Sequence, residues 1–160
     1  MPFPLEIDIL RHGVLWPETL AGRKLEEIIS QDVFAALQIS NAQMSGPAAL
    51  SLLLTNDDEQ QQLNKKWRGQ DRSTNVLSFS QIAPFAPVSG LLGDISLAHE
   101  TVVREALELQ KPLCDHLSHL VVHGFLHILG YDHQTDKEAS EMESLETRVL
   151  AYLAIADPYA

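Results

Sequence analysis

Residues 123–133 read HGFLHILGYDH and contain three histidines whose spacing suits a metal site. His123 and His127 are four positions apart, so one face of a helix would present both imidazoles. Gly130 can take the left-handed conformation that ends a helix, after which the chain can turn back and bring His133 to the same face. Three converging neutral imidazoles leave a fourth coordination position open, so the segment predicts a catalytic metal site. Zinc suits these ligands best, although nickel, copper and iron also accept imidazole.

One position of this segment departs from the zinc-peptidase signature H-E-x-x-H-x-x-G-x-x-H, because Gly124 stands where the catalytic glutamate should be. That glutamate takes a proton from water and delivers it to the leaving amine, and glycine can do neither. Phosphodiester cleavage makes other demands: charge builds on non-bridging oxygens, which a metal and an arginine can stabilise. The pattern therefore disfavours a peptidase and leaves phosphodiester chemistry open, with an activated water as nucleophile or, if RNA is the substrate, its own 2′-hydroxyl.

The elements that must position these histidines follow from the hydrophobic pattern. A helix at 112–129 carries four histidines on one face and is apolar nearly everywhere else, so we expect it to be buried. The loop at 81–90 has two prolines and a glycine, which exclude regular structure there. The order of elements predicts an α+β domain with a small mixed sheet. The expected strands are 5–10, 49–55, 74–80 and 91–98, and the other expected helices are 18–38, 57–67, 99–110 and 135–155.

Length and composition limit the class of protein. The 160 residues fit one domain spanning 1–160. No apolar run approaches the roughly 20 residues that cross a bilayer, and the N-terminus lacks a secretory pattern, so we expect a cytoplasmic protein without membrane contact. The single cysteine, Cys114, excludes an intrachain disulfide and lies too far back along the helix to close a structural zinc site. The net charge of −11 would on average repel nucleic acid.

A basic cluster interrupts this acidic background at the end of the helix predicted for 57–67. Trp67 lies in its centre, surrounded in sequence by Lys65, Lys66, Arg68 and Arg72. By itself such a cluster is most often a solvated helix end. For Trp67, packing in the core is favoured over stacking on a base.

The histidine segment resembles the signature of the YbeY family, bacterial metal-dependent endoribonucleases of ribosomal RNA maturation. LNKKWRGQDRSTNVLSF at 63–79 is similar to the arginine-bearing segment of that family, and LLGDISLA at 91–98 to its G-D-I strand. The similarity extends over most of the chain from about Leu50 onward. One departure is Asn75, which stands where an aspartate is common. The resemblance implies a zincin-like α+β fold with the ligand helix at its centre.

The resemblance also implies the site residues and the function. It assigns His123, His127 and His133 as ligands of one Zn²⁺ per chain, and Arg68 as a catalytic residue together with His123. The implied activity is single-strand-specific endoribonuclease action in ribosomal RNA processing, including small-subunit rRNA 3′ end maturation, and in ribosome quality control. The expected partners are ribosomal RNA and the ribosome or its assembly proteins, and no DNA. The acidic surface suggests that such a partner delivers the substrate.

Several roles and two rival functions follow from these residues. We expect Arg68 to clamp the scissile phosphate with two hydrogen bonds, Lys65 and Lys66 to bind neighbouring phosphates, and Trp67 to stack a base if it does not pack in the core. His119 is either a donor behind a metal ligand or a buried histidine. Asp132 either orients a ligand imidazole or belongs to a turn. The rivals are a non-catalytic ribosome-assembly factor with a structural zinc and a degenerate zinc peptidase.

Overall fold

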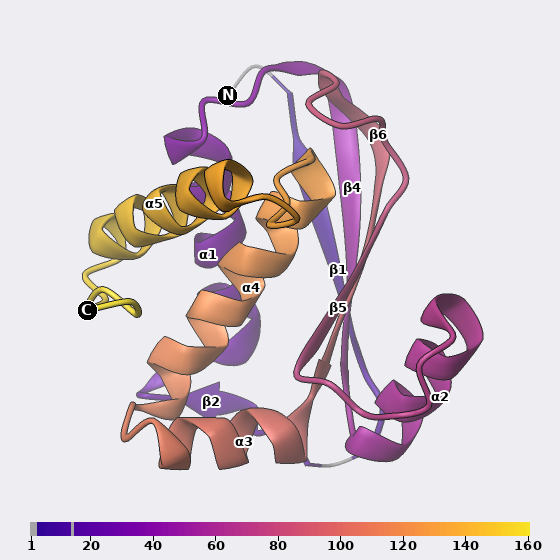
Figure 1. Ribbon diagram of the computed structural model, residues 1–160, viewed down its shortest axis with the longest axis vertical. Helices are drawn as coiled ribbons and strands as arrows, with labels where there is room; N and C mark the ends of the chain where they lie inside the picture. The colour runs from indigo at the N-terminus through magenta and orange to yellow at the C-terminus, as the bar shows by residue number, and fades with distance from the viewer. Residues whose placement is uncertain (1–2, 14) are drawn as a thin grey trace.

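A four-stranded sheet is the frame of the protein, and most of its helices cover one face (Figure 1). The computed structural model describes residues 3–13 and 15–160. The strands are β1 (Leu5–Arg11), β2 (Thr19–Leu20), β3 (Arg23–Lys24), β4 (Met44–Thr55), β5 (Val76–Ser80) and β6 (Val88–Ala98). The helices are α1 (Leu25–Ile39), α2 (Asp57–Arg68), α3 (His99–Glu108), α4 (Leu113–Leu129) and α5 (Asp136–Tyr152).

The sheet is mixed, with the order β1-β4-β6-β5. β1, β4 and β6 run parallel, whereas β5 pairs antiparallel with β6 and forms one edge. Leu50, Leu52 and Leu54 of β4 alternate onto the face that α1, α4 and α5 cover, and all three are buried. Helix α2 lies on the opposite face, near one end of the sheet (Figure 1). The predicted α+β class is therefore confirmed.

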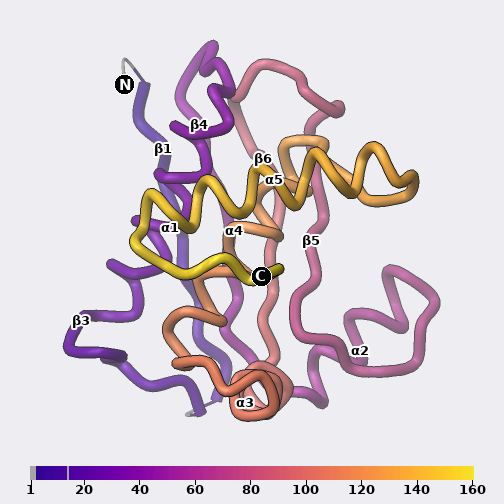
Figure 2. The backbone as a smooth tube through the Cα atoms, turned by 60° about the vertical axis from the view of Figure 1, so that its left-hand side comes forward, coloured from indigo at the N-terminus to yellow at the C-terminus, as the bar shows by residue number. Residues whose placement is uncertain are grey.

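Helix α4 is the central helix and contacts α1, α3, α5, β5 and β6. Its burial on most sides follows from its apolar sequence, and Leu117, Val121 and Phe125 are completely inaccessible to solvent. The helix ends at Gly130, where φ is +123°. A Cβ there would lie 2.7 Å from the amide nitrogen of Phe85, so this tight turn requires glycine. Figure 2 shows the chain turning here from α4 into α5, which crosses in front of it.

The prediction of a helix at 18–38 is wrong for its N-terminal part. Residues 19–24 form the β2–β3 hairpin, and α1 begins only at Leu25. Ala21 and Gly22 have φ values of +52° and +78°. Two consecutive left-handed residues make the tight turn that joins hairpin strands, and they cannot continue a right-handed helix.

Two strands are longer than predicted. β4 begins at Met44 rather than at residue 49, and β6 begins at Val88, inside the loop for which regular structure was excluded. Met44 pairs with Val88, and a register shift follows before Ala48. Gly90, with φ at +72°, lies within this irregular stretch. A β-bulge allows a strand to include residues that a regular ladder of backbone hydrogen bonds would exclude. The proline and glycine content of the sequence does not show by itself that a bulge forms here.

Candidate metal centre

Three histidines meet at the C-terminal end of α4. His123 and His127 come from successive turns of the helix, and His133 comes from the segment between α4 and α5. Each offers one nitrogen within 4.8 Å of the others. The Nε2 atoms of His123 and His127 are 3.0 Å apart. Two nitrogen ligands of one tetrahedral zinc ion would be separated by about 3.4 Å, so the residues fit a single transition-metal ion. That they bind one stays a prediction.

The outer nitrogens of the two helical histidines have their own acceptors. His123 Nδ1 donates to Oε1 of Glu146 at 2.6 Å, and His127 Nδ1 donates to the carbonyl oxygen of Tyr131 at 2.9 Å. With the proton on Nδ1, each Nε2 keeps its lone pair. Such outer hydrogen bonds fix the tautomer and the direction of a ligand imidazole. The two helical histidines therefore have the tautomer that metal binding through Nε2 requires.

The surroundings of the cluster keep His127 neutral and Glu146 charged. Burial, reinforced by the neighbouring His123 and His133, lowers the pKa of His127 to about 4. Burial by itself would raise the pKa of Glu146, but hydrogen bonds from His119, His123 and Tyr159 hold that pKa at about 2. At neutral pH His127 is thus a neutral imidazole and Glu146 a buried, ionised carboxylate.

Glu146 is the site residue that the sequence reasoning missed. It lies on α5 and is fully buried, although it belongs to the strongly acidic C-terminal part of the chain. One signal could have identified it: Glu146 falls within the stripe at helical spacing formed by Met142, Leu145, Val149 and Leu150, which is otherwise apolar. A carboxylate in a buried stripe needs a partner.

Gly124 lies between the two helical histidines and packs directly against the edge strand. A Cβ at this position would lie 3.0 Å from Oγ of Ser78 and 3.3 Å from Cγ2 of Ile95. The Ser78 hydroxyl also donates to the Gly124 carbonyl oxygen at 3.1 Å. The close approach of α4 to β5 thus occupies the space in which the glutamate of a zinc peptidase would begin.

A groove of about 560 Å³ runs past the histidines between the end of α4 and β5. Arg68 lines this groove from the end of α2, together with all three histidines. Its Nη2 donates to the carbonyl oxygen of Ser78, and its Cζ lies 5.0 Å from the centre of the Phe79 ring. Thr74 and Asn75 line the same groove. The structure therefore brings together the four residues proposed from the sequence as catalytic or metal-binding.

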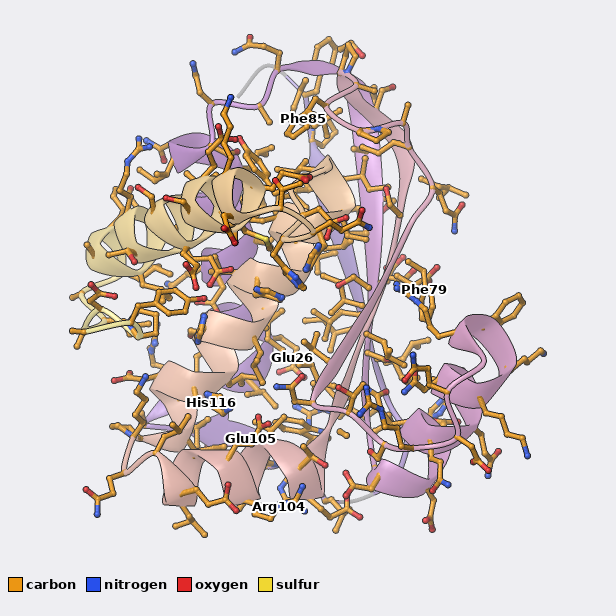
Figure 3. All side chains as sticks on the ribbon, in the orientation of Figure 1. Glu26, Phe79, Phe85, Arg104, Glu105 and His116 are labelled. Atoms are coloured by element: carbon orange, nitrogen blue, oxygen red, sulfur yellow. The ribbon has the colours of Figure 1, made fainter. Side chains whose placement is uncertain are left out.

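The other residues of the basic cluster lie elsewhere. Trp67 is 61% exposed, so the prediction that it packs in the core is wrong. It belongs to the last turn of α2 and borders an apolar groove of about 430 Å³ on the opposite face of the sheet, toward which Phe79 also points (Figure 3). Lys66 Nζ lies 4.9 Å from the Trp67 ring, and Lys65 is 3.8 Å from Asp71 in an exposed ion pair. Neither lysine lines the groove with the histidines.

The remaining polar residues near the centre have clear partners. His119 Nε2 lies 2.8 Å from Oε2 of Glu146, so His119 shares a carboxylate with His123. His116 is buried and its Nε2 lies 2.9 Å from Oε1 of Glu105, which faces it from α3 (Figure 3). Asp132 accepts a hydrogen bond from the backbone amide of His133, which is turn chemistry.

Comparisons with known proteins agree with this architecture. A family model described as Endoribonuclease YbeY matches residues 18–154. A protein of Rhizobium meliloti (strain 1021) with that name is 55% identical over 162 residues, covering 97% of this chain and 95% of the relative. One from Allorhizobium ampelinum is 49% identical over 163 residues, covering 98% and 95%.

A solved structure supports the fold independently. The solution structure of a Thermotoga maritima protein superposes with a TM-score of 0.56 at 23% identity, over 92% of this chain and 91% of that one. Together with the histidine cluster, this confirms the zincin-like α+β fold. Among the described residues, no helix has the length and apolar character needed to cross a membrane. The chain belongs to the YbeY endoribonuclease family.

Proposed function

We propose that the protein is a metal-dependent endoribonuclease that cleaves ribosomal RNA and holds one zinc ion per chain through His123, His127 and His133. The observation that carries the proposal is the shared groove, in which Arg68 and the three histidines line one surface. Phosphodiester cleavage needs positive charge from two directions around the phosphate, and this arrangement supplies it. The names of the relatives add the activity class.

The side chains of the groove have separable tasks. A metal ion at the histidines would supply Lewis-acid polarisation of a phosphate oxygen. Arg68 binds two oxygens of the same phosphate with its planar fork. The Ser78 carbonyl and the Phe79 ring hold that guanidinium in place before substrate arrives. Such preorganisation lowers the barrier because no side chain has to be reoriented during the reaction.

Substrate delivery follows from the charge of the chain. A net charge of −11 disfavours strong unaided RNA binding, so the ribosome or an assembly protein would bring the RNA to the groove. Lys65 and Lys66 would bind phosphates beside the groove, and the exposed Trp67 would stack a base. Stacking requires an unpaired base, which fits a single-stranded substrate. We place this activity in small-subunit rRNA 3′ end maturation and ribosome quality control in the cytoplasm, with residues 1–160 acting as one domain.

Two rival functions fit the geometry less well. A structural zinc would normally have four protein ligands, whereas the described cluster comprises three histidines. A peptidase would need a general base beside the metal. Gly124 provides none, and Glu146 has both carboxylate oxygens engaged in hydrogen bonds. The nuclease reading therefore stands ahead of both.

Single-turnover cleavage of a structured ribosomal RNA fragment tests the proposal. Arg68→Ala should slow cleavage by about 10²–10³-fold, because one preorganised charge-stabilising donor is lost, and metal content should not change. Arg68→Lys should restore part of the rate, since lysine keeps the charge but lacks the fork. Arg72→Ala is the matched control, because Arg72 is exposed nearby but does not line the groove. Equal rates for wild type, Arg68→Ala and His127→Ala would refute the nuclease assignment.

A further inference from the structure

We propose that Tyr159, in the C-terminal segment after α5, is a positioning residue for the metal centre. Its hydroxyl holds the carboxylate of Glu146, and that carboxylate in turn orients His123. The inference rests on the proposed metal site and extends it. It makes the orientation of one proposed ligand, His123, depend on a residue 36 positions further along the chain.

The argument begins with the burial of Glu146. Its side chain is 1% exposed, and both oxygens are in use. Oε1 accepts from His123 Nδ1 at 2.6 Å, while Oε2 accepts from His119 Nε2 at 2.8 Å and from the Tyr159 hydroxyl at 2.5 Å. A buried carboxylate is held by the donors that satisfy its lone pairs. The two donors to Oε2 therefore fix the orientation of the carboxylate, and this orientation sets the position of Oε1 relative to His123.

Tyr159 is held in place to make this contact. Asp157 Oδ1 accepts from the Tyr159 amide at 2.8 Å and from the hydroxyl of Thr147 at 3.3 Å, which ties the segment to α5. The Tyr159 ring meets the His119 ring edge-on, with the centroids 5.7 Å apart. Figure 2 shows the chain turning back after α5, so that its end lies beside the middle of α4. The backbone hydrogen bond to Asp157 and the ring contact with His119 thus both hold the Tyr159 side chain in position.

The direction of the hydrogen bond follows from acid–base chemistry. Burial, together with the adjacent Glu146 carboxylate, raises the pKa of Tyr159 above its ordinary value. The phenol therefore stays protonated and donates, and the ionised carboxylate accepts. The result is an ordered chain of contacts from Tyr159 through Glu146 to Nδ1 of His123, whose Nε2 faces His127. Outer partners of this kind raise the basicity of a ligand imidazole and limit its rotation.

Tyr159→Phe is the sharpest test, because it removes the hydroxyl and leaves the ring against His119. Zinc affinity, measured by competition with a chromophoric chelator, should fall by about tenfold, since loss of an outer partner typically costs 10–100-fold. The absorption bands of Co²⁺ bound in place of zinc should also shift, because they report ligand geometry. Tyr152→Phe is the control: Tyr152 is 58% exposed at the end of α5 and should change neither property.

Glu146→Gln probes the centre of the same chain. An amide offers an N–H where the carboxylate accepted a hydrogen bond, so zinc affinity should fall further, toward about 100-fold. Glu143→Gln on the exposed side of α5 is its control. If Glu146→Gln does not fold, Tyr159→Phe decides the question alone.

The outcomes separate this inference from the proposed function. Unchanged zinc affinity and an unchanged Co²⁺ spectrum in Tyr159→Phe would overturn the positioning role, even if the melting temperature of the metal-free variant fell. In that case the contact would be structural and the metal site would stand. A wild-type protein that binds neither zinc nor Co²⁺ would instead refute the proposed metal site, and the positioning role with it.

Discussion

Helix α4 carries two pairs of histidines that resemble each other in sequence and differ in their surroundings. His116 and His119 each direct Nε2 toward a carboxylate, that of Glu105 in the first case and of Glu146 in the second. His123 and His127 instead use Nδ1 for their outer hydrogen bonds, and their Nε2 atoms face each other. The Nε2 atoms of the first pair are hydrogen-bonded to carboxylates, whereas the second pair lines the groove with its Nε2 atoms not bound to any carboxylate of the described residues.

The difference teaches that residue type and helical spacing do not make a metal ligand by themselves. Whether a histidine can bind a metal depends on which of its ring nitrogens is hydrogen-bonded to the rest of the protein. Glu105 comes from α3, Glu146 from α5 and the Tyr131 carbonyl from the segment after α4, so all three acceptors lie outside α4. If the surroundings distinguish the two pairs, substitutions in each pair should have different effects on metal content and stability.

The largest effect is expected from removing His123 and His127, the pair whose Nε2 atoms face each other. His123→Ala/His127→Ala should reduce bound metal from about one ion per chain to nearly none, because one imidazole cannot hold a transition-metal ion in competition with a chelator. His116→Gln should keep its metal, since His116 is bound to Glu105. Elemental analysis of untagged protein after dialysis measures both. Full metal content in the double variant would remove the distinction between the pairs.

A smaller effect is expected from Gly124, which lies between His123 and His127 in α4. Gly124→Glu should lower the free energy of unfolding by about 1–3 kcal/mol, because the added side chain pushes α4 away from Ser78 and Ile95 of the sheet. Urea denaturation of the chelator-treated protein measures this, with Gly124→Ala as the smaller change. We expect no peptidase activity in Gly124→Glu. Undiminished stability would show that α4 and β5 are not closely packed.

The smallest effect concerns His116 and acid. Burial lowers the pKa of His116 below its ordinary value, against the opposing influence of Glu105. Below about pH 6.5 the unfolded chain takes up a proton there that the folded chain resists, so acid favours unfolding. The stability advantage of wild type over His116→Gln should be complete at about pH 8 and should shrink toward about pH 5, with a slope of at most about 1.4 kcal/mol per pH unit. A difference independent of pH would show that His116 titrates normally.

The positions of most elements could be predicted from the sequence, because local patterns determine them. The stop at Gly130 and the periodicity of α4 both act within a few residues. The helix predicted from residue 18 failed for a local reason as well, since the hairpin turn at Ala21 and Gly22 interrupts a pattern that otherwise reads as helical. The early start of β6 depended instead on its pairing with β4.

For the site, the sequence by itself determined the three candidate histidines and the missing glutamate, since they lie in one short segment with a recognisable spacing, while the candidate arginine came from the resemblance to the YbeY family. Only the tertiary structure decided that Arg68 shares their groove, that Trp67 lies outside the core, and that Glu146 orients His123. These facts depend on contacts between segments far apart in the chain. A hydrogen bond or a packed surface between such segments leaves no periodic mark in either one, so it becomes visible only when the chain is folded.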